Sequence, residues 1–163
     1  MIKEKNQQEE RQTREQGKSW ILVAVDNSEY AKLVAEEAAK VALERKANVV
    51  FLSVVPIPSF VASEGEVDAE YLSDEENEFE KLHNELIDLY FKPNSGLLIE
   101  SKILHGDPAD KIVKYADEID ADLIVMGSKG QGKLASIFLG SVSRHVTHHS
   151  NRSVLVVKKK NNE

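Results

Sequence analysis

Five short apolar runs, separated by longer segments, constrain the fold of this chain more than any other feature. The runs occupy residues 20–25, 48–55, 97–104, 123–126 and 154–157. Each has the length of a buried strand, and valine, leucine and isoleucine dominate them. The intervening segments repeat apolar side chains at helical spacing or open with helix-capping residues. Strands that alternate with helices predict an α/β fold, a three-layer sandwich with a parallel sheet between helices.

Length and composition limit the kinds of protein to consider. The chain has 163 residues, which suits one domain, and a formal charge of −7, which disfavours binding to nucleic acid or anionic membranes. It has no cysteine, which excludes disulfides, thiolate catalysis and cysteine-based zinc sites. We expect a cytoplasmic protein, because residues 1–19 lack an apolar core and no apolar run approaches the roughly 20 residues that span a bilayer.

We expect the folded domain to occupy residues 19–159, between a flexible polar tail at 1–18 and a charged tail at 160–163. The third apolar run carries Glu100, Ser101 and Lys102 in its middle, which indicates an edge strand. Nine acidic and no basic residues lie between Glu64 and Glu80. This acidic run is interpreted as a solvated loop and helix face, with an interaction surface as the alternative.

The stretch from residue 121 to 158 carries the strongest functional signal. An apolar strand runs into Gly127, a glycine-rich loop follows, and Gly140 and Ser141 open a short helix. Four of the eight glycines of the chain fall between Gly127 and Gly140. Glycine lets backbone N–H groups approach an anion closely, and a helix N-terminus offers unpaired donors. This segment therefore predicts a phosphate site.

Asp26 ends the first strand as Gly127 ends the fourth, so neighbouring strands would place both at one crevice. We expect the hydroxyls of Ser128, Ser141 and Ser143 to lie beside the phosphates. The Asp26 carboxylate could accept a hydrogen bond from a ribose hydroxyl or a base amine. It could also cap the helix at 27–45, and the two roles can coexist.

Two familiar phosphate motifs match only in part. The segment 127–134 has P-loop spacing, but Leu134 stands where a magnesium-binding Ser or Thr is needed. The segment 130–135 resembles a dinucleotide fingerprint, but it starts several residues after the strand and lacks the later acidic residue. Both motifs are therefore rejected.

A longer pattern, Gly127-x2-Gly130 followed after nine residues by Gly140-Ser141, resembles the ATP-binding branch of the universal stress protein family. Asp26 after the first strand, Val54 near the end of the second, the turn at 106–108 and the closing strand are also similar to that family. The resemblance covers residues 19–159. It implies a Rossmann-like fold of the adenine nucleotide alpha hydrolase type, with strand order 3-2-1-4-5.

The resemblance also implies a ligand, which is ATP, AMP or ADP. Magnesium or manganese would be held mainly by the phosphates, and no protein side chain is assigned as a metal ligand or catalytic group. The implied nucleotide-binding residues are Ala24, Val25, Asp26, Val54, Met126, Gly127, Ser128, Gly130, Gly140, Ser141, Val142 and Ser143. Ala24 and Val25 depart from the family, in which some members have Pro-Thr before the aspartate.

Three other features leave alternatives open. His145, His148 and His149 share a helix face at a spacing that can bind zinc, although a solvent-facing helix end is the simpler interpretation. Lys129, Lys133 and Arg144 either add charge for phosphates or lie exposed. The apolar run at 154–157 would form an exposed sheet edge, which predicts a homodimer through this strand.

The favoured function is an ATP-binding stress or signalling protein that acts through its conformation or an unknown protein partner. No strong general base accompanies the loop, so at most slow ATP hydrolysis is expected. The alternative is a nucleotide-independent interaction module of the same fold. An adenylating ligase is disfavoured, because it would need a second substrate domain.

Overall fold

The computed structural model describes residues 17–57, 67–93, 95–130 and 139–160. The expected tails at 1–18 and 160–163 lie almost entirely outside these residues. So do Lys133, Leu134 and most of the loop after the second strand.

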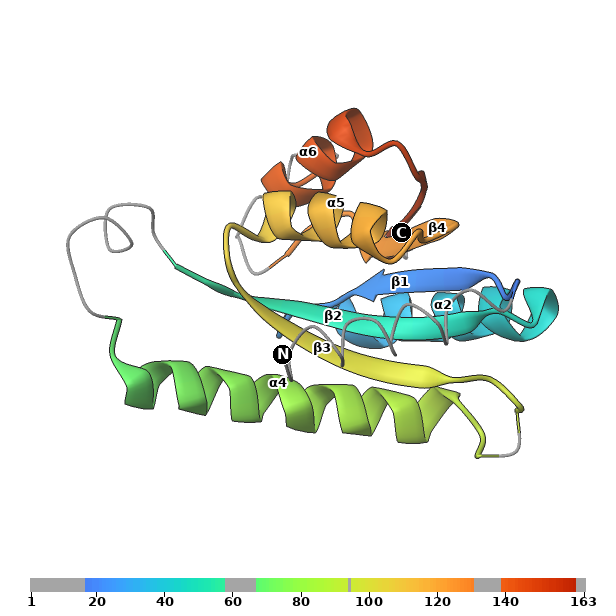
Figure 1. Ribbon diagram of the computed structural model, residues 1–163, viewed down its shortest axis with the longest axis horizontal. Coiled ribbons are helices and arrows are strands. Elements are labelled where there is room, and N and C mark those ends of the chain that lie inside the picture. The colour runs from blue at the N-terminus through green and yellow to red at the C-terminus, as the bar shows by residue number, and fades with distance from the viewer. Residues whose placement is uncertain (1–16, 58–66, 94, 131–138, 161–163) are drawn as a thin grey trace, which may run out of the picture.

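Five parallel strands form one sheet in the order β3-β2-β1-β4-β5. The strands are β1 (Trp20–Ala24), β2 (Asn48–Pro56), β3 (Ile99–Gly106), β4 (Leu123–Gly127) and β5 (Ser153–Val157). The helices are α2 (Ala31–Arg45), α4 (Ala69–Tyr90), α5 (Pro108–Glu118) and α6 (Ser141–His149). In Figure 1, α4 lies below the sheet while α5 and α6 lie above it. The three-layer α/β fold, the strand order and the edge position of β3 are therefore confirmed.

The two faces of the sheet bury separate apolar clusters, because successive side chains of a strand point to opposite faces. Along β1, Ile21 and Val23 join α2 and α4 in one cluster. Trp20, Leu22 and Ala24 join α5 and α6 in the other. All five β1 residues are buried, which is why this strand reads as an unbroken apolar run.

The helix after β1 begins later than the capping residues suggest. Ser28 donates its backbone N–H to the Asp26 carboxylate at 3.0 Å, and Tyr30 donates its own to the Ser28 hydroxyl at 3.3 Å. These bonds hold residues 26–30 in turns, so α2 starts at Ala31. Asp26 is thus not the cap of this helix. Asp107 is the cap of α5, since its carboxylate accepts the N–H of Asp110 at 2.9 Å.

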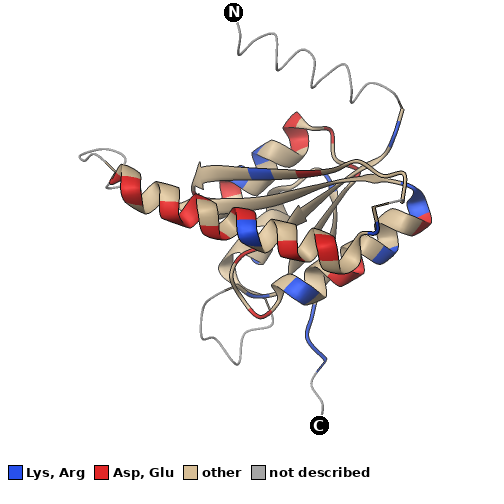
Figure 2. Ribbon diagram, turned by 90° about the horizontal axis from the view of Figure 1, so that it is seen from below, with Lys and Arg blue, Asp and Glu red and all other residues tan. Residues whose placement is uncertain are grey.

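The charged helix α4 lies along the outside of the sheet. In Figure 2 the red ribbon segments that mark Asp and Glu positions are spaced along most of its length. Of the described members of the acidic run, Asp68 caps the helix and Glu70 lies in its first turn, where carboxylates favour the helix dipole. Phe79, His83 and Leu86 are its buried residues, and most of its acidic side chains are exposed to solvent, whereas Glu75 and Glu76 are half-buried.

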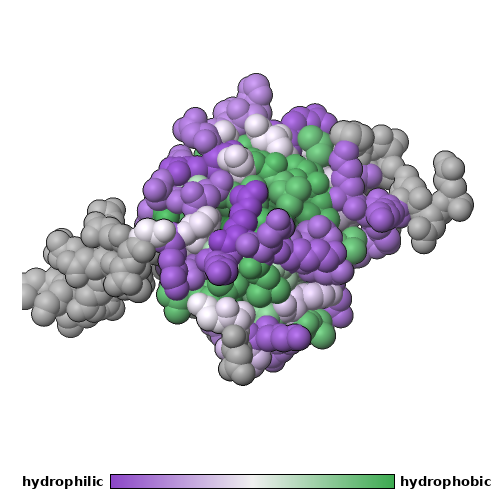
Figure 3. Space-filling view, turned by 90° about the vertical axis from the view of Figure 1, so that its right-hand side faces the viewer, coloured by the Kyte–Doolittle hydropathy of each residue, from purple (hydrophilic) through white to green (hydrophobic). Residues whose placement is uncertain are grey.

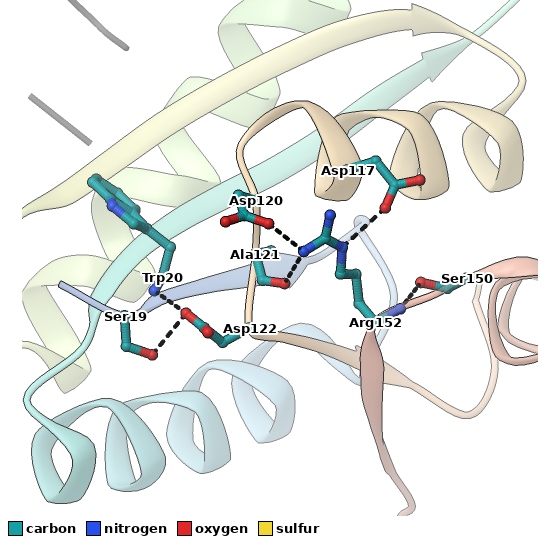
Figure 4. Close-up of polar contacts among 8 residues, drawn as sticks. All are labelled: Ser19, Trp20, Asp117, Asp120, Ala121, Asp122, Ser150 and Arg152. Atoms are coloured by element: carbon teal, nitrogen blue, oxygen red, sulfur yellow. Dashed lines mark hydrogen bonds and ion pairs between the residues drawn. The ribbon is translucent and has the colours of Figure 1, made fainter. Parts of the chain in front are cut away.

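Hydrogen bonds and ion pairs connect the strands at the end of the sheet where the strands begin. Figure 3 views the molecule from that end, where hydrophilic side chains cross and surround the hydrophobic ones. Arg152, just before β5, donates to Asp117 at 2.9 Å and to Asp120 at 2.5 Å (Figure 4). The Asp122 carboxylate accepts the Ser19 hydroxyl at 2.9 Å and the Trp20 N–H at 2.8 Å. These bonds connect the starts of β1, β4 and β5.

A cluster of polar side chains lies between α4 and the sheet. His83 of α4 is fully buried, and its Nε2 lies 2.8 Å from the Ser53 hydroxyl of β2. Its Nδ1 lies 2.6 Å from the Ser101 hydroxyl of β3. Burial lowers the pKa of His83 to about 4, so the imidazole is neutral at pH 7.

The Asp122 contact predicts a stability loss. Replacing Asp122 with Ala removes a charged acceptor from two donors and should lower the free energy of unfolding by about 1–3 kcal/mol. Urea denaturation at pH 7 measures the change. Asp88→Ala, on the exposed face of α4, is the control and should change stability by less than about 0.5 kcal/mol. Equal effects of the two substitutions would contradict the assigned contact.

The buried His83 predicts a pH dependence of stability. Its folded pKa lies below the ordinary value of 6.5, so the unfolded chain takes up a proton first as the pH falls. Its contribution to stability is complete above pH 6.5, and about 3 kcal/mol of it should be lost by pH 4. The measurement is the stability of the wild type minus that of His83→Gln from pH 7 to pH 4. A constant difference would show that His83 protonates equally in both states.

Candidate functional site

A cavity of about 320 Å³ opens at the carboxyl ends of the strands, the end to the left in Figure 1. In a parallel sheet of this order, β1 and β4 are the strands between which the direction of chain progression reverses, which is where such folds bind ligands. Eleven of the twelve candidate residues line the cavity: Ala24, Val25, Asp26, Val54, Met126, Gly127, Gly130, Gly140, Ser141, Val142 and Ser143. Ser128 is the exception.

Ser128 is buried and holds the two ends of the glycine loop together. Its carbonyl oxygen accepts the Gly140 N–H at 2.7 Å and the Ser143 hydroxyl at 2.8 Å. Its own N–H donates to the Val157 carbonyl at 2.8 Å, which ties the loop to β5. The Ser143 hydroxyl is therefore used within the protein, and Ser141 is the candidate serine left to offer a hydroxyl to the cavity.

The N-terminus of α6 faces the cavity. The first bond of the helix runs from the Arg144 N–H to the Gly140 carbonyl at 3.0 Å. The N–H groups of Ser141, Val142 and Ser143 precede that bond, so the helix offers them no carbonyl partner. Three such donors and the positive end of the helix dipole together attract an anion.

Asp26 lies against Gly130 across the cavity mouth. Its Oδ1 accepts the Ser28 N–H, whereas a Cβ atom placed on Gly130 would lie 2.6 Å from its Oδ2. Gly127 is equally close to its surroundings, since a Cβ atom there would lie 3.0 Å from the Tyr30 Cβ. Both glycines therefore leave room for side chains that line the cavity.

Residues of α4 and α5 complete the cavity lining, and the sequence did not predict them there. Glu75 and Phe79 of α4 line the cavity, and so do Pro108 and Ile112 of α5. Phe79 could be found as part of the apolar stripe of α4, but Glu75 is one of many acids in the acidic run. Helices on both faces thus reach over the end of the sheet.

The described cavity lining carries more negative than positive side chains. Among the described lining residues, Asp26 and Glu75 are carboxylates and Lys129 carries the positive charge. An anionic ligand therefore depends on backbone N–H groups more than on side-chain charge. Arg144 is not part of the lining and donates to the Leu139 carbonyl at 3.4 Å.

The histidines of α6 do not form a metal centre. His145 pairs with Asp110 at 3.2 Å, and its ring stacks on that of His149 at a centroid distance of 4.1 Å. Within the described parts of the chain, no three His, Cys, Asp or Glu side chains are placed to hold a metal ion. The described residues thus do not supply a zinc site at these histidines. In the same parts of the chain, every helix is too short or too polar to cross a membrane.

Comparison with known proteins places these features in a family. The model of the universal stress protein family matches residues 20–158. Universal stress protein MJ0531 of Methanocaldococcus jannaschii is 35% identical over 147 residues, which are 88% of this chain and 84% of that protein. Universal stress protein UspA from Lactobacillus plantarum has a similar structure, with a TM-score of 0.74 at 26% identity over 85% of this chain and 97% of that one.

Two further solved structures are described as nucleotide complexes. A universal stress protein in complex with cAMP has a TM-score of 0.65 at 27% identity, over 85% of this chain and 96% of that one. The universal stress protein from Archaeoglobus fulgidus in complex with dAMP has a TM-score of 0.63 at 27% identity, over 86% and 98%. The family model and the M. jannaschii relative both span most of the sequence, so this chain belongs to the universal stress protein family.

Proposed function

We propose that this protein binds an adenine nucleotide in the cavity, with ATP as the main ligand and AMP or ADP as alternatives. In this proposal it acts in stress response or signalling through a nucleotide-dependent conformation that a protein partner recognises. The observation that carries the proposal is the helix N-terminus of α6, whose first N–H groups face a cavity already lined by Gly127 and Gly130. The related structures with cAMP and dAMP support the same ligand class.

The cavity has two chemically different ends. Backbone N–H groups of Ser141 to Ser143 suit phosphate oxygens. Val54 of β2 and Phe79 of α4 offer apolar surface, which suits a purine ring. Asp26 lines the cavity beside Gly130, and its Oδ2 could accept a hydrogen bond from a ribose hydroxyl or a base amine. We therefore place the phosphates at α6 and the nucleoside beside Asp26.

Magnesium or manganese would be held mainly by the phosphates of the bound nucleotide. Mg²⁺ commonly binds nucleotide phosphates with few protein ligands. The described lining holds no histidine and only two carboxylates, Asp26 and Glu75, so slow hydrolysis at most is proposed. Mass spectrometry of the compound released from purified protein would identify the nucleotide bound in cells.

We propose in addition that two copies of the chain pair through β5. This strand is one edge of the sheet, and its residues Val154, Leu155 and Val156 are only partly buried. An apolar edge with open backbone groups favours pairing with another chain.

The nucleotide proposal predicts a defined effect of filling the Gly130 position. Gly130→Val places side-chain atoms where the Asp26 carboxylate lies, so ATP affinity should fall by about tenfold or more. Isothermal titration with ATP and magnesium measures it. Glu44→Ala is the control, since Glu44 is exposed near the end of α2 and is not part of the cavity lining. Absence of ATP binding to the wild type would favour the nucleotide-independent interaction module.

The dimer proposal predicts a change of mass in solution. Val156 belongs to neither apolar cluster of the core, so Val156→Lys can place a charge at the edge without opening the core. Light scattering should give twice the chain mass for the wild type at micromolar concentration and a single chain mass for Val156→Lys. A wild-type monomer under these conditions would refute pairing through β5.

A further inference from the structure

Four elements meet in a single chain of hydrogen bonds next to the cavity. Ser101 of β3 contacts His83 of α4, His83 contacts Ser53 of β2, and Ser53 contacts the Val25 carbonyl after β1 at 2.7 Å. His83 and Ser53 both have no exposed surface. The bonds from His83 through Ser53 to Val25 therefore lie in the interior, whereas Ser101 at the other end of the chain of bonds is exposed.

The chemistry of the groups sets the direction of every bond in this chain. A carbonyl oxygen only accepts, so the Ser53 hydroxyl must give its one hydrogen to Val25. The Ser53 oxygen must then accept from His83, which places the imidazole proton on Nε2. Burial keeps the ring neutral at pH 7, so Nδ1 is bare and accepts from the Ser101 hydroxyl. All donors point toward Val25.

The last bond fixes the backbone next to the Asp26 side of the cavity. Val25 donates its N–H to the Leu52 carbonyl at 3.0 Å and accepts at its own carbonyl from Ser53. Both polar groups of this residue are thus held by β2. Val25 and Asp26 line the cavity in succession, so a shift of Val25 would carry the Asp26 carboxylate with it.

The hydrogen bonds of His83 fix the position of α4, which lines another side of the cavity. Glu75, Phe79 and His83 follow one another at intervals of four residues, so they share one face of α4. Glu75 and Phe79 line the cavity, and His83 lies one turn further along the same face. The imidazole bonds therefore set how far α4 lies from β2 and where its cavity-lining turns stand.

Packing alone does not require an imidazole at this position. Leucine would fill similar space without the cost of burying polar atoms, and replacing a whole set of bonded polar groups by apolar groups of the same shape can be nearly neutral for stability. What His83 adds is a directed contact that holds a helix and a strand end in one geometry. Its Nε2 leads through Ser53 to Val25 on one side of the cavity, and the helix that carries it supplies Glu75 and Phe79 to another side.

We propose that His83 and Ser53 are positioning residues for the nucleoside half of the nucleotide site. They hold Val25 and Asp26 on one wall and Glu75 and Phe79 on the other at the spacing that the base and ribose require. This inference rests on the proposed nucleotide function. The N-terminus of α6 lies outside the hydrogen-bond chain, so phosphate binding does not depend on it.

The test compares three ligands on matched variants at 25 °C, after circular dichroism shows each variant to be folded. His83→Leu removes both hydrogen bonds and should weaken adenosine, AMP and ATP by the same factor, about tenfold. His83→Gln can donate and accept, and should return affinity to within about threefold of the wild type. Leu86→Val, also fully buried on α4 but apolar, is the control and should leave all three affinities unchanged.

Several results would overturn the proposal. Wild-type affinity in His83→Leu, a loss confined to ATP, or equal losses in His83→Gln and His83→Leu would each do so. Absence of binding of all three ligands to the wild type would instead show that the proposed function itself is wrong. If His83→Leu does not fold, Ser53→Ala takes its place, with the same tenfold loss expected and wild-type affinity contradicting the role of Ser53.

Discussion

The carbonyl oxygen of Ser128 is the contact on which the candidate site depends. It accepts hydrogen bonds from the Gly140 N–H and the Ser143 hydroxyl, and so joins the end of β4 to the start of α6. The intervening loop is thereby closed at its base, and the first turn of α6 is aimed at the cavity. Because the Gly140 N–H is used in this closure, the next three N–H groups are the ones left for an anion.

Closure at Ser128 also explains how an acidic protein could hold an anionic ligand. The formal charge is −7, and the described cavity lining adds Asp26 and Glu75 to one lysine. Attraction must therefore come from oriented backbone dipoles, which act on the ligand at short range despite the negative net charge of the protein. The carboxylates come from other elements, Asp26 from the end of β1 and Glu75 from α4, and they suit the hydroxyl and amine donors of a nucleoside. Different groups of one cavity thus meet the two chemical demands.

Much of this arrangement follows from local patterns. Apolar runs and helix-capping residues predicted the parallel sheet and its helices, because burial on both faces and helix ends have strong local signals. The resemblance to the universal stress protein family implied residues such as Asp26, Gly130 and Gly140, which the fold gathers at the cavity. The contributions of Glu75 and Phe79 could not be predicted, since they depend on where α4 crosses the end of the sheet. The Ser53–His83–Ser101 cluster was missed for the same reason: its members are isolated polar residues that only the tertiary fold brings together.

A crystal structure of the protein with ATP and magnesium tests the central claim most directly. The account predicts phosphate oxygens within hydrogen-bond distance of the N–H groups of Ser141 to Ser143. It also predicts the nucleoside between Asp26 and Phe79, in the cavity bounded by β1, β4 and α4. ATP bound at another surface, or a cavity that stays empty at saturating ATP, would contradict it.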